Sequence, residues 1–194
     1  TINTMNDLRL EGKAGKLGKI MYAVAYTSSK GKSFRNPTKH DIDAAHRASE
    51  TVSSTFEQLP FGIPNDPMPN ENALGMRAPK YGFTTWDMMF SGRQLAMLGV
   101  FSNLVRKAFE EMKKTGTPIE LTEAITAYLA CVVDKLADYN SAFVAWQPAG
   151  CKGANTFQRW AIPMKWDFTE NNVLDSDSGG YAGVLKWVTE PLIG

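Results

Sequence analysis

Two long amphipathic segments constrain the fold of this 194-residue chain more than any other feature. Residues 92–114 and 119–139 each carry apolar side chains at a spacing of three or four, the period of an α-helix that buries one face. Only Thr-Gly-Thr-Pro, residues 115–118, separates them. Helices joined by so short a connection pack side by side in opposite directions, so the sequence predicts a central antiparallel helix hairpin.

Weaker patterns surround this pair. Residues 19–36 predict a β-hairpin, with strands near 19–26 and 32–35 around a Ser-Ser-Lys-Gly turn. Thr38 followed by Asp41 predicts the start of a helix over about 39–57, and a short helix is expected over 180–189. Several prolines make 58–83 a long irregular loop. The predicted fold class is α+β, an N-terminal β-hairpin followed by a mainly helical domain.

Composition is that of one ordinary globular domain, with 43% hydrophobic and 21% charged residues. We expect residues 1–18 to be a basic flexible lead-in and residues 19–194 to form the single α+β domain. The sequence contains no run of 18 apolar residues, so no membrane span is predicted. Cys131 lies in a helical pattern and Cys151 has no CxxC partner, so reduced thiols and a cytoplasmic location are expected, with Cys131 buried. The start at Thr1 suggests a piece of a longer protein.

Arg93 is out of place at the start of the helix predicted over 92–114, because a helix N-terminus carries partial positive charge. Asp138 is equally out of place at the end of the helix over 119–139. Antiparallel packing brings these two ends together, so we expect Arg93 to pair with Asp138 or with a carbonyl of 138–141. This polar cluster would also contain Gln94, Asn140 and Ser141. It would either tie the helix ends together or shape a ligand or nucleic-acid surface.

Motifs for catalysis or metal binding are not evident in the sequence. His40 and His46 lack the spacing of a paired metal site, and neither cysteine has a local histidine partner. No glycine pattern of a P-loop or dinucleotide site is present. The tryptophans that alternate with basic residues suit either base stacking or a small core; they are Trp146, Trp160 and Trp166.

Several stretches, in this order, resemble the middle segment of a family of large prokaryotic DNA methylases, described as adenine-specific and containing a zinc ribbon. In that family the segment reads F-[TNS]-x-RQL, then D-x-N-S, N-T-F and M-x-WDF-x-E. Here these are Phe90 to Leu95, Asp138 to Ser141, Asn155 to Phe157 and Met164 to Glu170. The element that is commonly NPF in the family reads Asn171 to Leu174 here. The resemblance spans roughly residues 11–181.

The resemblance implies that this chain is an insert between two catalytic halves. In such methylases an S-adenosylmethionine motif lies upstream and a catalytic Asp-Pro-Pro-Tyr motif downstream, and neither occurs here. We therefore expect no catalytic residue, no metal and no cofactor in this segment, with S-adenosylmethionine bound by the parent protein and the rest of that parent as a partner.

The resemblance also implies a target-recognition role, because methylation of a base amine requires extrusion of the base. Residues 11–39 carry seven basic side chains and one acid, a net charge of +6, which suits phosphate contacts. The candidate contacts are Lys13, Lys16, Lys19, Lys30, Lys32 and Arg35. The alternative is a scaffold that joins the catalytic halves without touching DNA, whose exposed helix faces would form one apolar patch. An independent enzyme is the third interpretation.

Overall fold

The computed structural model describes residues 4–73, 75–158, 161–175 and 179–193 of the chain. An antiparallel β-hairpin near the N-terminus is followed by a mainly helical body, so the predicted α+β class is confirmed. The hairpin consists of β1 (Val24–Ser28) and β2 (Gly31–Arg35), joined at Ser29-Lys30 with Ser28 opposite Gly31. A second ribbon pairs β3 (Trp146–Gln147) with β4 (Lys152–Gly153).

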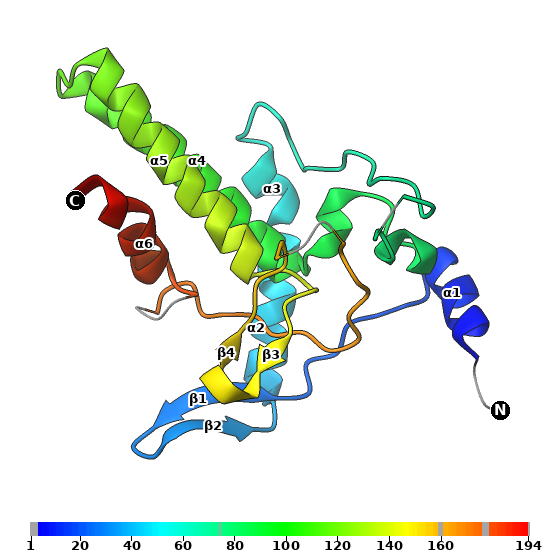
Figure 1. Cartoon of the computed structure of the whole chain (residues 1–194). Helices are drawn as coiled ribbons and strands as arrows, with labels where there is room; N and C mark the ends of the chain where they lie inside the picture. Colours follow the sequence, from blue (N-terminus) through cyan, green and yellow to red (C-terminus); the bar gives the residue numbers. More distant parts are fainter. Residues whose placement is uncertain (1–3, 74, 159–160, 176–178, 194) are drawn as a thin grey trace.

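The central helices are α4 (Gly92–Lys114) and α5 (Ile119–Tyr139), and both match the predicted bounds. They lie side by side and project beyond the rest of the chain (Figure 1). At about 1.5 Å per residue, α4 is about 34 Å long. Its buried residues all fall between Gln94 and Gly99, whereas its remaining turns are exposed or half-buried. The helix pair is therefore anchored at one end only.

Three apolar clusters make the core at that anchored end. One joins Leu98, Val132 and Leu136 of the helix pair to Val184 of α6 (Tyr181–Ile193). A second packs Phe56 and Leu59 against Leu95, beside α3 (Val52–Phe56). The third is built from the loops, and its buried members are Met68, Met76, Ala78, Met89, Ala142, Phe143 and Ile162. The loop predicted over 58–83 thus contributes to the core.

The helix predicted over 39–57 is divided into α2 (Lys39–Glu50) and α3, with the break at Thr51. Thr38 and Asp41 form the predicted cap. Hydroxyl groups at the break bond to main-chain carbonyls, as Thr51 does with Ala48. Such bonds compete with regular helix geometry, which explains the division.

Residues 1–18 were expected to be a flexible lead-in, and the structure corrects this over α1 (Met5–Lys13). Thr4 and Asp7 bond reciprocally and cap its N-terminus. The helix packs its Gly12 backbone on the short 3₁₀ helix η1 (Ala78–Tyr81) and on Gly82. Two further 3₁₀ turns are η2 (Trp86–Met89) and η3 (Pro148–Gly150).

The helices among the described residues include none that is both long and apolar enough to cross a lipid bilayer.

Gly82 offers a test of the packing between α1 and η1. It has a φ of +89°, and a Cβ there would overlap the Gly12 carbonyl. Gly15 also has a positive φ, +71°, but a Cβ there would meet open space. Gly15→Ala should cost about 1 kcal/mol in the free energy of unfolding, from backbone conformation alone. Gly82→Ala should cost about 1–3 kcal/mol more, measured by urea denaturation, because two main-chain segments must separate. Equal losses in the two variants would contradict this packing.

Candidate functional site

The start of α4 is fixed by a reciprocal cap. The Ser91 Oγ accepts from the amide of Gln94 at 3.2 Å, and the Gln94 Oε1 accepts from the amide of Ser91 at 2.8 Å. Gln94 is almost fully buried, with 3% of its surface exposed. A neutral glutamine in this reciprocal cap adds no charge to the helix N-terminus, so an anion is still favoured there.

That anion is Glu170. Its carboxylate accepts from the Ser91 Oγ at 2.7 Å and from the Arg93 Nε at 2.6 Å, and Arg93 Nη2 lies 2.5 Å from the same carboxylate. The expected pairing of Arg93 with Asp138 is therefore wrong. Arg93 is tolerated at the start of α4 because a carboxylate from 77 residues away neutralises both the guanidinium and the helix terminus.

Asp138 closes the end of α5 in a different way. Its carboxylate accepts from Lys135 at 2.8 Å, from the Asn155 side chain at 2.6 Å and from the Phe157 amide at 2.8 Å. Burial raises the pKa of Asp138, but these three donors together lower it more, so the net shift is downward. The Thr156 amide and hydroxyl also bond to the Asp138 carbonyl, which satisfies a free group at the helix end.

Asn140 and Ser141 extend the network to two further segments. The Asn140 Oδ1 accepts from the main-chain amide of Asn171 at 2.8 Å, and the side-chain Nδ2 of Asn171 donates to the Tyr139 carbonyl at 2.7 Å. The Ser141 hydroxyl shares a hydrogen bond of 2.8 Å with that of Thr156. Both Asn140 and Ser141 are fully buried. We call the whole network the motif cluster: Ser91, Arg93, Gln94, Asp138, Asn140, Ser141, Asn155, Thr156, Glu170 and Asn171.

Two side-chain nitrogens of the motif cluster, Gln94 Nε2 and Asn140 Nδ2, are buried without an acceptor among the described residues. An unsatisfied buried donor costs about 1–3 kcal/mol. Stability alone therefore does not explain why these polar groups of the motif cluster are buried.

The segment before β1 lies against the motif cluster. Lys19 donates to the Phe90 carbonyl at 2.7 Å, and Tyr22 donates to Asp167 at 2.5 Å. Desolvation lowers the pKa of Lys19, although the carboxylates of Glu170 and Asp87 oppose this. Lys19 was a candidate DNA contact; the residue is exposed, but its ammonium group bonds to the protein's own main chain.

Three other candidate DNA contacts also pair internally. Lys13 lies 2.8 Å from Glu71, and Lys16 lies 3.0 Å from Glu11. Arg35 binds both carboxylate oxygens of Asp41, at 2.7 and 2.9 Å. Lys30 stands on the turn of the β1–β2 hairpin and Lys32 on β2.

Lys32 borders a polar cavity of about 420 Å³ that the sequence did not reveal. Its other lining residues are Gly150, Lys152, Gly153, Asn171, Asn172, Asp175, Gly179 and Gly180. One signal in the sequence was the set of glycines at 150, 153, 179 and 180; at Gly153 and Gly179 the lack of a Cβ lets the Asn171 side chain approach the main chain closely. The cavity lies next to the motif cluster, because Asn171 belongs to both.

The stacking candidates lie in different environments. Trp146 packs edge-on against Phe34, with ring centroids 5.5 Å apart, and so holds the two β-ribbons together. Trp166 is 54% exposed and contacts Tyr81 edge-on at 5.2 Å. Trp160 lies outside the described residues.

No group of three possible metal ligands among His, Cys, Asp and Glu occurs in the described part of the chain. Both cysteines are free and exposed, so the expectation that Cys131 is buried is wrong. The helical pattern of α5 predicted an inward side chain there, but α6 leaves that side of Cys131 open.

Comparison with protein-family models, with curated proteins and with solved structures found no match to this chain.

The pairing of Arg93 can be tested with double-mutant cycles. Arg93→Ala and Glu170→Ala should couple by about 1 kcal/mol in the free energy of unfolding, a modest value because Arg93 is partly exposed. The losses in the free energy of unfolding caused by Arg93→Ala and by Asp138→Ala should be additive within about 0.5 kcal/mol. Coupling of Arg93 to Asp138 larger than to Glu170 would contradict the structure.

Asp138 predicts a pH dependence. Because its pKa is lowered on folding, its contribution to stability is present above the unfolded pKa and is lost as pH falls through the folded pKa. Asp138→Asn places a side-chain NH₂ group next to the three groups that donate to Asp138. This change should lower the free energy of unfolding by about 2 kcal/mol at pH 7. The difference in the free energy of unfolding between this variant and the wild-type chain should shrink below about pH 4, as measured by urea denaturation across pH. Asp134→Asn, exposed on the same helix, is the control, and a gap that does not change with pH would refute the assignment.

Proposed function

We propose that this chain is a non-catalytic, DNA-contacting segment of an S-adenosylmethionine-dependent methyltransferase that acts on a base amine, with adenine as the expected base. The observation that carries the proposal is the motif cluster. Four stretches that resemble methylase motifs are separated by up to about 80 residues. The first bonds to the fourth through Glu170, the second bonds to the third through Asp138, and Asn171, directly after the fourth, bonds to Asn140 of the second. The meeting of these four stretches at one end of the helix pair is the support for the proposal.

The methyl donor and the catalytic motif belong, in this proposal, to the remaining parts of the parent chain, which are also its main partner. The protein would act in the cytoplasm, where a prokaryotic enzyme meets DNA.

The surface favoured for phosphate contact is the β1–β2 hairpin with the adjoining β4 edge. The hairpin projects at the end of the molecule opposite the tip of the helix pair (Figure 1). Lys30 lies at its turn, and Lys32 and Lys152 border the same polar cavity. Phosphate oxygens are commonly bound by lysine side chains, and this surface carries three of them, Lys30, Lys32 and Lys152.

Binding of a 20-base-pair duplex, followed by fluorescence anisotropy over a range of salt concentrations, tests the proposal. Lys30→Glu with Lys32→Glu and Lys152→Glu should weaken binding at least tenfold. The slope of log K against log salt should fall by about 0.9 for each phosphate that the variant no longer binds.

The matched control places the same charge change at the tip of the helix pair, with Lys107→Glu, Lys113→Glu and Lys114→Glu. This control should bind DNA within twofold of the unaltered chain. Equal losses in both triple variants, or no binding by the unaltered chain, would refute the role of the hairpin.

A scaffold that joins the two catalytic halves without DNA contact is the second candidate function. It is favoured by the exposed apolar side chains of the helix pair, such as Leu104 and Leu121, each about half exposed. A chain that binds no DNA but associates with the other parts of the parent would favour this alternative.

A further inference from the structure

Trp166 is an exposed tryptophan whose ring is held by a buried neighbour. It keeps 54% of its surface exposed, although Met164 and Phe168 on either side pack against the core cluster that the loops build. Its ring meets the buried ring of Tyr81 edge-on, with centroids 5.2 Å apart. An edge-on contact uses at most one face of an indole, so Tyr81 leaves a flat face of Trp166 uncovered. The sequence suited either base stacking or a small core, and this exposure favours stacking.

Three cations gather where α1 packs on η1. The guanidinium carbon of Arg9 lies over the Tyr81 ring, 5.7 Å from its centroid. The Lys13 ammonium group lies 2.8 Å from Glu71. The pKa of Glu71 is lowered, first by its hydrogen bond from Lys13 and further by the positive charges of Lys80 and Arg9. The three cations therefore share one carboxylate. We call this surface the α1 platform: Arg9, Lys13, Lys80, Tyr81 and Trp166.

The three segments that form the α1 platform have a positive balance of charge. Residues 5–18, 71–81 and 164–168 together carry six cations and four carboxylates. Every one of these carboxylates has a partner inside the protein; the pairs are Asp7 with Thr4, Glu11 with Lys16, Glu71 with Lys13 and Asp167 with Tyr22. Four of the cations form no ion pair with a described residue, and these are Arg9, Arg77, Lys80 and Lys165. The excess positive charge is therefore not neutralised within the described part of the chain.

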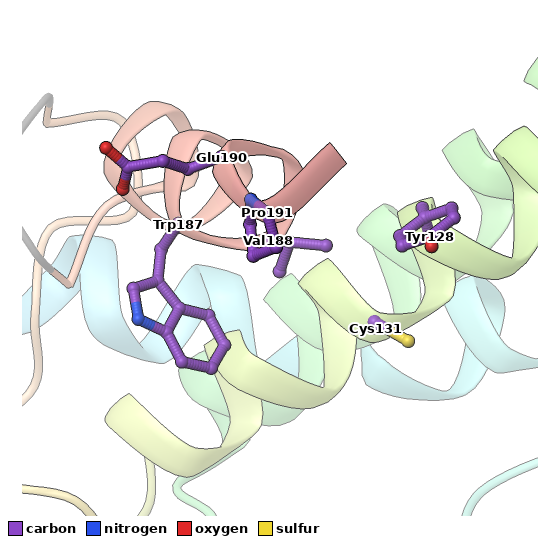
Figure 2. Close-up of a pocket in the computed structure, with 6 residues that line it drawn as sticks. All are labelled: Tyr128, Cys131, Trp187, Val188, Glu190 and Pro191. Atoms are coloured by element: carbon purple, nitrogen blue, oxygen red, sulfur yellow. The ribbon is translucent and has the colours of Figure 1, made fainter. Parts of the chain in front are cut away.

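Trp187 on α6 is exposed to a similar degree, 62%, but has different surroundings. Figure 2 shows it at a pocket between α5 and α6, on the same helix as Glu190. A lysine lies over its ring, but this residue, Lys135, already pairs with Asp138. Trp187 is thus an exposed indole with a carboxylate at the same pocket and an already paired lysine over its ring, which makes it a suitable control for Trp166.

We propose that the α1 platform binds an unpaired stretch of DNA, with a base stacked on Trp166 and the adjoining phosphates held by the surrounding cations. Aromatic side chains hold single strands by stacking, and a neighbouring positive surface holds their phosphates. Such binding tolerates any sequence, because every base has a flat face. The inference rests on the proposed function and deepens it, since a methyltransferase that extrudes a base must contact a strand that is locally unpaired.

The α1 platform is separate from the surface favoured for duplex contact. Figure 1 shows α1 and the β1–β2 hairpin at different sides of the molecule. The two surfaces share no residue, so changes in one can be compared with changes in the other.

Fluorescence anisotropy of a labelled single strand of 12 nucleotides tests the proposal. The unaltered chain should show saturable binding. An abasic strand of equal length has the same phosphates but no bases, and it should bind about tenfold more weakly because stacking is lost. A polyglutamate peptide of equal charge should not displace the single strand.

Variants at the two exposed tryptophans assign the stacking. Trp166→Ala should weaken binding of the single strand about tenfold and leave binding of the abasic strand within about twofold. Trp166→Phe keeps a flat ring and should retain binding of the single strand within about threefold. Trp187→Ala is the matched control and should bind both strands as the unaltered chain does. Circular dichroism should confirm that each variant keeps its helix content.

The cations have a test of their own. Arg9→Ser with Lys80→Ser should weaken binding of both strands. The slope of log K against log salt should fall by about 0.7 for each phosphate contact that is lost. Arg106→Ser with Lys107→Ser removes the same charge from exposed positions of α4 and should leave both strands unaffected.

Four outcomes would overturn the proposal. They are equal binding of the two strands, unchanged binding by Trp166→Ala, equal losses in Trp166→Ala and Trp187→Ala, and displacement of the single strand by polyglutamate, which would identify an acidic peptide as the ligand.

A failure of this inference is distinguishable from a failure of the proposed function. Suppose the triple variant at Lys30, Lys32 and Lys152 loses duplex binding while Trp166→Ala changes nothing; the hairpin role then stands and the α1 platform is refuted. Suppose instead that single-strand binding depends on Trp166 while the triple variant binds duplex normally; the α1 platform then stands and the hairpin role is refuted.

Discussion

The carboxylate of Glu170 at the start of α4 is the interaction on which the rest of the arrangement depends. It neutralises Arg93, accepts from the capping Ser91 and supplies the anion that the helix N-terminus favours. Because Asn171 follows directly and bonds to Asn140, the same short segment also fixes the end of α5. The start of α4 and the end of α5 are thus joined by a segment that belongs to neither helix, and the polar contacts of the helix pair gather at this end.

This anchoring divides the helix pair into two parts with different energetics. Near the anchor, Leu98, Val132 and Leu136 are buried, and their removal from water drives the packing. Farther along, apolar residues such as Ile125 and Leu121 remain exposed, so local helix propensity and contacts between α4 and α5 must hold that part. An exposed apolar surface of this kind lowers solubility and is typical of a binding surface.

Features with a short repeat in the sequence were predicted well, and those that depend on distant partners were not. The bounds of α4 and α5 followed from apolar periodicity, whereas the partner of Arg93 did not, because no local pattern specifies a carboxylate 77 residues away. The break at Thr51 reflects hydroxyl-to-carbonyl bonds that a hydrophobic pattern cannot show. The helix α1 was missed because residues 1–18 were expected to be a basic flexible lead-in, although the Thr4–Asp7 cap was readable. The polar cavity depends on the meeting of three segments and had no single sequence signature.

The chain presents two surfaces of different chemistry. The β1–β2 hairpin offers lysines on a projecting ribbon, whereas the outer half of the helix pair exposes apolar side chains such as Leu104 and Leu121 among charges of both signs. A polyanion is attracted to the first surface, whereas the second surface has no net charge to attract it. Such a layout suits a connecting element that holds one partner by charge and another by apolar burial.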